Sequence, residues 1–345
     1  MHLRDPRSHC SGSTLTDSGL KDRTSSCRAR AAIMGLSFVA FLATSGSAVG
    51  QDRPACDDDG WARANLNATA WVQTSAEYRG LALGAYNMAT TRIDEAIADT
   101  TWTALPEQEG EQIAALPLAI ILDVDETVLD NFAFQAWAVQ NKKEWSPDTW
   151  HEWVMDARAT DVPGSREFID YARKRGVNFF YLTNRDHKHN GEDVERYTVE
   201  NLKNMELLPE QAFPQSVLNK DGAVELNGEV LENVVLMKGE KKDVWGSDKT
   251  SRRALFLKHY RVILLIGDSL GDFIGFKGVD FYKALKHKAI REELKKYQYR
   301  WGKSWIVLPN PTYGSWERSL YDFKDGLAPG CKAAMKEQHL APWSP

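Results

Sequence analysis

Two carboxylates separated by one residue, Asp123 and Asp125, directly follow an apolar run at residues 118–122. The run is too short for a free-standing helix and contains two isoleucines, which favours a strand buried on both faces. Ligands of open α/β sheets bind at the carboxyl ends of such strands. Acids at that place suit the transfer of a negatively charged phosphoryl group if a cation such as Mg²⁺ compensates their charge. The alternative is that both residues cap a helix or lie in a turn.

Polar residues end other apolar runs in the same way. Thr183 and Asn184 follow one run, and Asp268 and Asp272 follow another. Apolar runs that alternate with helical segments predict an α/β fold, a doubly wound parallel sheet with right-handed crossovers. The polar residues then meet at one edge of the sheet. The further strands are expected at residues 177–182, 234–237, 261–266 and 305–308.

The helices of this fold are expected between the apolar runs. Apolar residues at steps of three and four predict one or two amphipathic helices between residues 66 and 98, packed on the sheet. A helix is expected at residues 166–175, closed by Gly176. The charged segment at residues 186–206 predicts a solvated helix.

The acids at the strand ends can divide the chemistry of phosphoryl transfer. Asp123 can attack phosphorus in line and form an aspartyl phosphate. Mg²⁺ would be held by the Asp123 carboxylate, the backbone carbonyl of Asp125 and Asp268. The Asp125 side chain points the other way, so it can protonate the leaving oxygen and later accept a proton from water. Asp272 would orient a metal-bound water or Lys249.

The transferred group carries negative charge on three oxygens, so positioned donors are needed. The candidates are the Thr183 hydroxyl, the Asn184 amide and Lys249, which the Ser247-Asp248 cap would place in the first turn of a helix that runs to about residue 259. Lys238 is the rival for the lysine role because it follows the third strand. An ordinary turn or a solvated lysine is the alternative for these residues.

Aromatic residues are concentrated after the first motif. Trp137 and Trp153 are expected in the core. Trp150, and Tyr313 in a loop bounded by Pro and Gly, lie where a flat ring can stack on a base or another planar leaving group.

The first fifty residues are typical of an export signal, with basic residues before an apolar run at 31–43 and small residues up to position 50. We therefore expect residues 1–50 to be a leader, 51–112 a helical extension and 113–345 the catalytic domain, in a protein exported to the periplasm or the exterior. The net charge of −5, from 43 basic and 48 acidic residues, argues against nucleic-acid polymers as partners.

Four cysteines occur, of which Cys10 and Cys27 fall in the expected leader. Cys56 and Cys331 remain, and an even pair in an exported protein predicts a disulfide between them, with two free thiols as the alternative. Lipid attachment at Cys56 is not expected, because the preceding residues, DRPA, lack the small and aliphatic residues that such a site needs.

Four segments together resemble the four motifs of the haloacid dehalogenase (HAD) superfamily. The resemblance is to its bacterial class C acid phosphatases, a secreted group that includes outer-membrane lipoprotein 5'-nucleotidases. It implies a Rossmann-like core with an N-terminal helical extension and a small α cap, Mg²⁺-dependent hydrolysis of phosphate monoesters, and often a homodimer. The segments are DVDET at 123–127, LTNR at 182–185, DKTSRR at 248–253 and GDSLGDF at 267–273.

The resemblance also implies a role for individual residues. Asp123 is implied to be the nucleophile and a metal ligand, with Asp125 as the acid/base. Ser269 stands where many relatives have Asn, and no lipid-anchoring cysteine follows the leader. The other implied roles are metal binding for Asp268 and Asp272, phosphate binding for Thr183, Asn184 and Lys249, and stacking on a nucleotide ring for Trp150 and Tyr313.

Two other classes of protein remain open at this point. Receiver domains of signalling systems combine acids, a Thr and a Lys on a parallel sheet, but they lack an export leader and an acid placed as Asp125 is. An exported nucleotide-binding protein without catalysis would use the aromatic residues alone.

Overall fold

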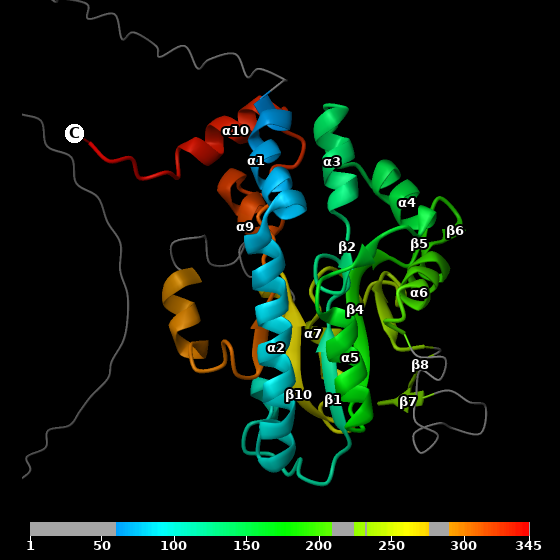
Figure 1. Cartoon of the computed structure of the whole chain (residues 1–345). Helices are drawn as coiled ribbons and strands as arrows, with labels where there is room; N and C mark the ends of the chain where they lie inside the picture. The colour runs from blue at the N-terminus through cyan, green and yellow to red at the C-terminus, as the bar shows by residue number, and fades with distance from the viewer. Residues whose placement is uncertain (1–59, 209–223, 232, 276–289, 345) are drawn as a thin grey trace, which may run out of the picture. The chain divides into compact units, whose positions relative to one another are not determined.

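The computed structural model describes residues 60–208, 224–231, 233–275 and 290–344. At its centre is a five-stranded parallel sheet with the strand order β11-β10-β1-β4-β9 (Figure 1). All five strands were predicted from apolar runs. Their bounds are β1 Leu118–Leu122, β4 Asn178–Asp186, β9 Val235–Lys238, β10 Arg261–Gly267 and β11 Trp305–Val307.

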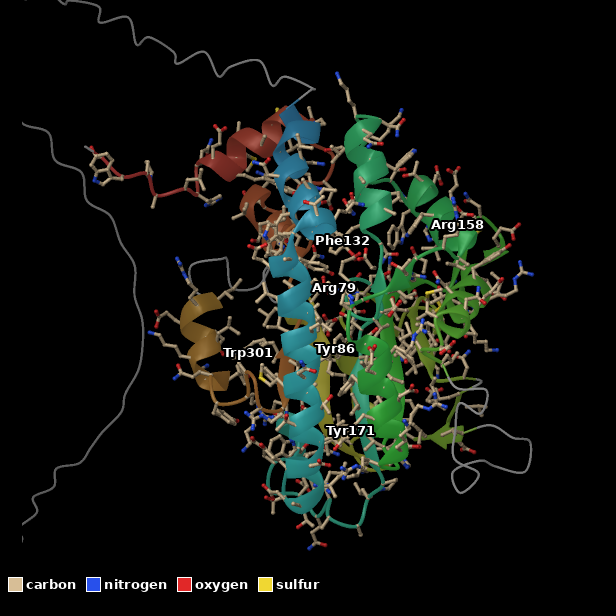
Figure 2. The ribbon with its side chains drawn as sticks, viewed as in Figure 1. Arg79, Tyr86, Phe132, Arg158, Tyr171 and Trp301 are labelled. Carbon is tan, nitrogen blue, oxygen red and sulfur yellow. The ribbon has the colours of Figure 1, made fainter. Side chains whose placement is uncertain are left out.

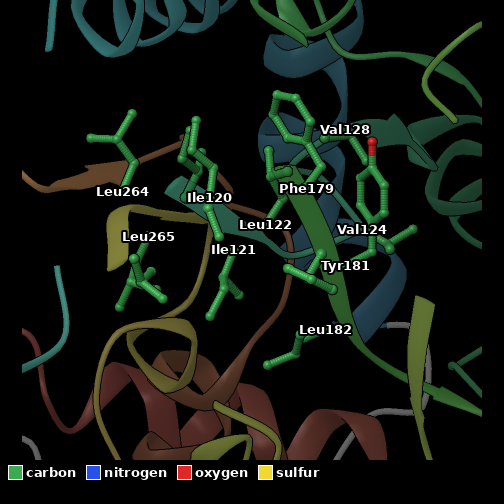
Figure 3. Close-up of a cluster of buried hydrophobic side chains, with 14 of the residues drawn as sticks. Ile120, Ile121, Leu122, Val124, Val128, Phe179, Tyr181, Leu182, Leu264 and Leu265 are labelled. Atoms are coloured by element: carbon green, nitrogen blue, oxygen red, sulfur yellow. The ribbon is translucent and has the colours of Figure 1, made fainter. Parts of the chain in front are cut away.

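Both faces of the sheet are covered, as expected for strands that are apolar throughout. Successive side chains of a strand point to opposite faces. Phe179 on β4 packs edge-on against Phe168 of α5 (Ser165–Lys174), whereas Phe180 packs against Phe256, which follows α7 (Thr250–Ala254). The side chains of β1, β4 and β10 form much of the core (Figure 3).

The predicted helical segment before the sheet consists of two helices, α1 (Gly60–Thr74) and α2 (Ala76–Ala98). They are separated at Ser75, whose side chain accepts a hydrogen bond from the Tyr78 amide and so caps α2. Tyr86 of α2 packs on Phe168, and its hydroxyl donates to the Thr127 carbonyl at 2.5 Å (Figure 2). The extension is thereby fixed to the loop that carries the first acidic motif.

Two helices, α3 (Phe132–Gln140) and α4 (Pro147–Asp156), lie between the short antiparallel strands β2 (Leu129–Asp130) and β3 (Thr160–Asp161). They form the small α cap. The expectation that Trp137 lies in the core is wrong. Its side chain is 39% exposed and stacks on Phe134, because almost all of α3 is apolar and one of its faces must meet solvent.

The segment at 186–206 is not a continuous helix. A hairpin, β5 (Lys188–His189) and β6 (Glu192–Asp193), precedes α6 (Val194–Asn204). Asn190 and Gly191 both have positive φ, which suits a two-residue hairpin turn. The helix after Lys249 is also shorter than predicted, since α7 ends at Ala254.

Shorter elements complete the chain: η1 Pro106–Gln108, β7 Val224–Leu226, β8 Glu229–Leu231, η3 Leu270–Asp272, η4 Lys295–Tyr297, α9 Ser315–Arg318, η5 Ser319–Tyr321 and α10 Pro329–Glu337. The expected leader and Cys56 lie outside the described residues. Cys331, in α10, is disulfide-bonded. No helix within the described ranges has the length and apolar character that crossing a bilayer requires.

Candidate active site

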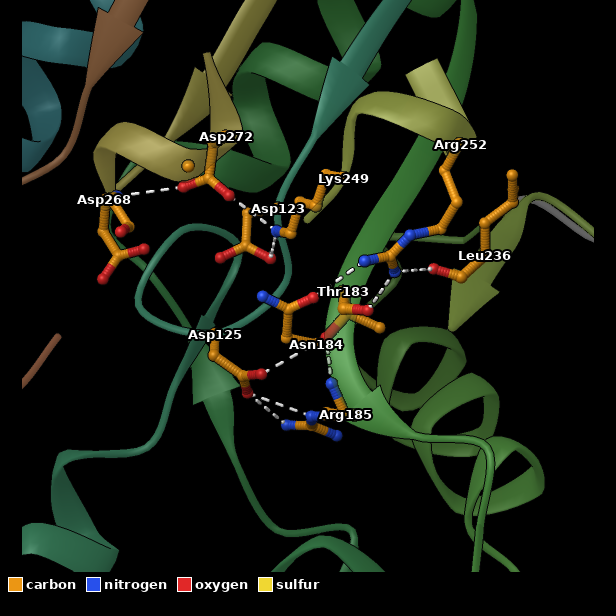
Figure 4. Close-up of polar contacts among 12 residues, drawn as sticks. Asp123, Asp125, Thr183, Asn184, Arg185, Leu236, Lys249, Arg252, Asp268 and Asp272 are labelled. Atoms are coloured by element: carbon orange, nitrogen blue, oxygen red, sulfur yellow. Dashed lines mark hydrogen bonds and ion pairs between the residues drawn. The ribbon is translucent and has the colours of Figure 1, made fainter. Parts of the chain in front are cut away.

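The strand register brings the predicted site residues to one edge of the sheet. Leu122, the last residue of β1, is paired with Ile266 on β10 and with Tyr181 on β4. The residues that follow these partners therefore emerge side by side at the carboxyl edge. This places Asp123 between the acidic turn after β10 and the polar end of β4 (Figure 4).

Three carboxylates converge on one side of this edge. Asp123, Asp268 and Asp272 each offer an oxygen, and these oxygens lie within 4.8 Å of one another. Asn310, in the loop after β11, donates to Asp268 at 2.8 Å, and the Ser269 amide donates to Asp272 at 2.9 Å. Such a set of anchored carboxylate oxygens fits a hard divalent cation such as Mg²⁺.

Gly267 makes this arrangement possible. A Cβ atom at this position would lie 2.2 Å from a carboxylate oxygen of Asp272, so no larger residue fits. The Asp272 side chain can therefore fold back over the end of β10 and reach the acidic cluster.

The electrostatics of the cluster also favour a cation. Burial raises the pKa of Asp123 to about 7; Lys249 opposes this rise and Asp272 adds to it. Burial, with the charges of Asp123 and Asp272, raises the pKa of Asp268 well above its usual value. A divalent cation would reverse these shifts by stabilising the ionised carboxylates.

Lys249 completes the cluster from the N-terminal end of α7. Its buried ammonium lies 2.5 Å from Oδ1 of Asp123 and 2.6 Å from Oδ1 of Asp272. Burial disfavours the charged amine, but the two carboxylates more than compensate and raise its pKa, so the amine is protonated. Lys238 instead pairs with Asp186 at 2.9 Å and does not belong to this cluster.

The Asp125 carboxylate is directed away from the cluster. Its Oδ1 accepts hydrogen bonds from Arg185 and Asn131, and its Oδ2 accepts one from the Thr183 hydroxyl at 3.4 Å. The side chain is thus outside the group of three acids, which leaves its backbone carbonyl as the atom for the predicted role in metal binding. Two acids two residues apart have different environments, as a division into nucleophile and acid/base requires.

The end of β4 is held by a buried arginine that the sequence interpretation did not single out. Arg252 donates to the carbonyl of Thr183 at 2.5 Å, to the carbonyl of Leu236 at 3.1 Å and to the side chain of Asn184 at 2.8 Å. Asn184 also donates to the Ser247 carbonyl at 3.0 Å. Both candidate phosphate-binding residues of this strand end are therefore fixed before any ligand arrives.

Arg185 and Asn131 were also missed as contributors to the site. Arg185 and Arg252 are in the segments LTNR and DKTSRR, so their position inside the motifs is the signal that was available. An arginine in a polar segment is usually solvated, however, and only the tertiary structure shows that these two are buried.

The two predicted stacking residues lie on different elements. Trp150 is half-buried on α4, packs edge-on against Phe134, and has the Arg185 guanidinium 5.8 Å from its ring centre. Tyr313 is half-buried in the loop that also carries Asn310. Trp150 therefore lies next to Arg185, which hydrogen-bonds to Asp125, and Tyr313 shares a loop with Asn310, which donates to Asp268.

Comparison with known proteins agrees with this geometry. The model of HAD superfamily subfamily IIIB (acid phosphatase) matches residues 60–316. The chain is similar in structure to the class C acid phosphatase from Bacillus anthracis, with a TM-score of 0.63 and 28% identity over 83% of this chain and 100% of that one. A second structure, a class C acid phosphatase from Bacillus anthracis with tungstate bound, has a TM-score of 0.62 and 27% identity, over 82% of this chain and 99% of that one. The chain therefore belongs to the subfamily IIIB acid phosphatases of the HAD superfamily and is a phosphomonoester hydrolase.

Proposed function

We propose that the protein is an exported, Mg²⁺-dependent phosphatase that acts through an aspartyl-phosphate intermediate and accepts nucleoside 5'-monophosphates. The observation that carries the proposal is the convergence of Asp123, Asp268 and Asp272 within 4.8 Å, next to the buried ammonium of Lys249. Three acids and one amine leave an excess of negative charge, which a divalent cation would neutralise while stabilising the charge of the phosphoryl oxygens.

The residues of the chain would then act in two steps. Asp123 attacks phosphorus, and Asp125 protonates the ester oxygen as the alcohol departs. In the second step Asp125 accepts a proton from water, and the water oxygen displaces Asp123 from phosphorus to give inorganic phosphate. Thr183, Asn184 and Lys249 would bind the phosphoryl oxygens throughout. The tungstate in the related Bacillus anthracis enzyme, an oxyanion like phosphate, supports an anion site in this family.

Support for the substrate class comes from Trp150 and Tyr313, two half-buried aromatic residues, one on α4 and the other in the loop after β11. The surface of a nucleobase can stack on such rings, whereas a small phosphate ester cannot use them. Support for export comes from the leader-like first fifty residues and from the disulfide at Cys331, since disulfides persist in oxidising compartments.

The proposal is tested by assaying p-nitrophenyl phosphate and a set of nucleoside 5'-monophosphates with Mg²⁺ and with EDTA. Full activity in EDTA, or in the Asp123→Asn variant, would contradict the metal and nucleophile assignments. Equal kcat/KM for nucleotides and for glycerol phosphate would contradict the nucleotide preference. Fractionation of cells tests export, and light scattering of the pure protein tests whether it is a homodimer.

A further inference from the structure

We propose that Arg185 is a positioning residue that assigns different tasks to the two oxygens of Asp125. In this arrangement Oδ1 is held by the protein, and Oδ2 carries the proton to and from the substrate. The inference rests on the proposed acid/base role of Asp125, and it adds the structural device that orients this acid.

The two oxygens have unequal hydrogen bonding (Figure 4). Oδ1 accepts from Nε of Arg185 at 3.0 Å, from Nη2 of Arg185 at 2.9 Å and from Nδ2 of Asn131 at 2.9 Å. A carboxylate oxygen has about two lone-pair sites, so three donors saturate it. Among the described residues, the hydrogen bond that Oδ2 accepts comes from Thr183 at 3.4 Å, which is long for an O–H donor. Oδ2 is therefore the oxygen left for the substrate.

Arg185 is itself fixed from several sides. Its side chain is 1% exposed, and Nη1 donates to the Thr198 hydroxyl on α6 at 3.2 Å. Nη2 also lies 3.3 Å from the amide oxygen of Asn131, and the backbone amide donates to Thr183 at 3.1 Å. A guanidinium stays charged at all working pH values and is planar, so these contacts fix both its position and its orientation.

Asn131 is oriented by a further residue. The indole N–H of Trp153 donates to Oδ1 of Asn131 at 2.8 Å. An indole nitrogen can only donate, so the amide oxygen must face Trp153 and Arg185. The NH₂ group of Asn131 must then face Asp125. Trp153 therefore fixes the orientation of the Asn131 amide, so that its NH₂ group donates to Oδ1 of Asp125.

The same guanidinium contacts the proposed stacking surface. The Arg185 carbon Cζ lies 5.8 Å from the ring centre of Trp150, within the range of a cation–π contact. One side chain thus contacts both the acid and the aromatic residue proposed to hold the nucleobase.

The role of Arg185 has a definite chemical consequence. When the P–O bond to the leaving group breaks and the P–O bond to Asp123 forms, the proton on Oδ2 of Asp125 moves to the ester oxygen. Water later returns a proton to Oδ2 as its oxygen bonds to phosphorus and Asp123 is released. Loss of Arg185 leaves the atoms of this sequence unchanged but allows the acid to rotate out of alignment. Substrates with poor leaving groups depend on this proton and should suffer most.

The test compares kcat/KM for alkyl phosphates and for 2,4-dinitrophenyl phosphate, whose leaving group needs no proton. Arg185→Gln should lower kcat/KM for alkyl phosphates about 100-fold and for the dinitrophenyl ester less than about 3-fold. Asp125→Asn should also lower kcat/KM more for alkyl phosphates than for the dinitrophenyl ester, and its loss on alkyl phosphates should be larger than that of Arg185→Gln. Arg300→Gln is the matched control, because Arg300 is equally buried but bonds to Thr103 and Glu109 outside the site; its losses should not depend on the leaving group.

Arg185→Gln removes a buried charge, which can prevent folding. A second variant therefore tests the inference with the charge of Arg185 in place. Trp153→Phe keeps an aromatic side chain and removes the N–H that orients Asn131; we expect a loss of about threefold to tenfold on alkyl phosphates alone. If Asp125→Asn shows no dependence on the leaving group, the acid role itself is wrong. If the loss in Asp125→Asn depends on the leaving group but the Arg185 and Trp153 variants lose activity equally on both substrates, the inference is overturned while the phosphatase assignment stands.

Discussion

The buried ammonium of Lys249 bridges two carboxylates, and its removal by Lys249→Met should be costly for both stability and activity. The Lys249 side chain is 4% exposed, and the contacts to Asp123 and Asp272 are 2.5 and 2.6 Å long. Breaking a buried pair from one side leaves uncompensated charge and costs about 3–5 kcal/mol. At about 2–4 °C of Tm per kcal/mol, the metal-free variant should melt about 6–20 °C below the wild type.

The stability lost in Lys249→Met should depend on pH, and the direction of this dependence follows from the pKa of Asp123. Lys249 lowers the pKa of this carboxyl, which burial nevertheless raises to about 7. Without Lys249 the pKa rises further, so the folded variant binds a proton at pH 5.5 that the unfolded chain releases above about 4. The stability of the variant therefore falls as pH rises, and the difference from the wild type should be larger at pH 8 than at pH 5.5.

Thermal unfolding in EDTA provides the measurement, with a double-mutant cycle to isolate the pair. Asp272→Asn combined with Lys249→Met should cost less than the sum of the single changes, because loss of the amine then leaves one unpaired carboxylate, Asp123, instead of two. Lys238→Met is the matched control; this lysine pairs with Asp186, is 37% exposed, and should cost at most about 1 kcal/mol. If the stability costs of Lys249→Met and Asp272→Asn add in the double variant, and the cost of Lys249→Met is the same at both pH values, the proposed buried ion pair is refuted. In the Mg²⁺-loaded enzyme, the variant should lose about 30-fold to 1000-fold in kcat/KM, which corresponds to about 2–4 kcal/mol for one positioned donor.

Three further outcomes are expected. Mg²⁺ should raise the Tm of the protein, and its apparent affinity should fall as pH falls from 8 to 5, because the raised pKa values of Asp123 and Asp268 let protons compete with the metal; a Tm titration at several pH values checks this. Burial raises the pKa of Glu126 well above 4.5, so the proton that it holds stabilises the fold below pH 4.5, and this contribution is lost as pH rises. Glu126→Gln should therefore be more stable than the wild type at pH 7 and similar at pH 4 in urea denaturation; lower stability at pH 7 would contradict it. Trp150→Ala should raise KM for nucleoside monophosphates more than for glycerol phosphate, which has no ring to stack, and equal changes in steady-state assays would count against stacking.

The strands were predictable because their signal is local. Residues 118–122 and 262–266 are apolar at every position, which only a strand buried on both faces requires over so short a length. The polar residues at their ends then follow from topology, since the carboxyl ends of parallel strands meet at one edge. This is why Asp123 and Asp268 could be assigned to one place from the sequence, whereas Lys249 was assigned from the expected helix cap and from the motif resemblance.

The remaining features depend on contacts between distant segments. A charged run such as residues 186–206 is compatible with a helix or with a hairpin followed by a helix, and the pairing of Lys188 with Asp193 is not visible in the pattern. Likewise, the burial of Arg185 depends on α6 and on the cap, which supply Thr198 and Asn131. The expectation that an aromatic-rich segment lies in the core also overestimated the burial of Trp137, because a short apolar helix cannot bury every face.

The two halves of the site have different electrostatic requirements, although their central residues, Asp123 and Asp125, are separated by only one residue. Asp123 faces two more acids and one amine, so its surroundings need additional positive charge before they can bind an anion. Asp125 faces a guanidinium that already balances its charge, so its surroundings need nothing further. Side chains two residues apart would point to the same side in a regular strand. Because β1 ends at Leu122, Asp123 and Asp125 lie in the turn beyond it, and there one short segment can serve both environments. The half proposed to bind the metal and the half proposed to transfer the proton are therefore built from different partners, and the backbone between residues 123 and 125 is the structure that they share.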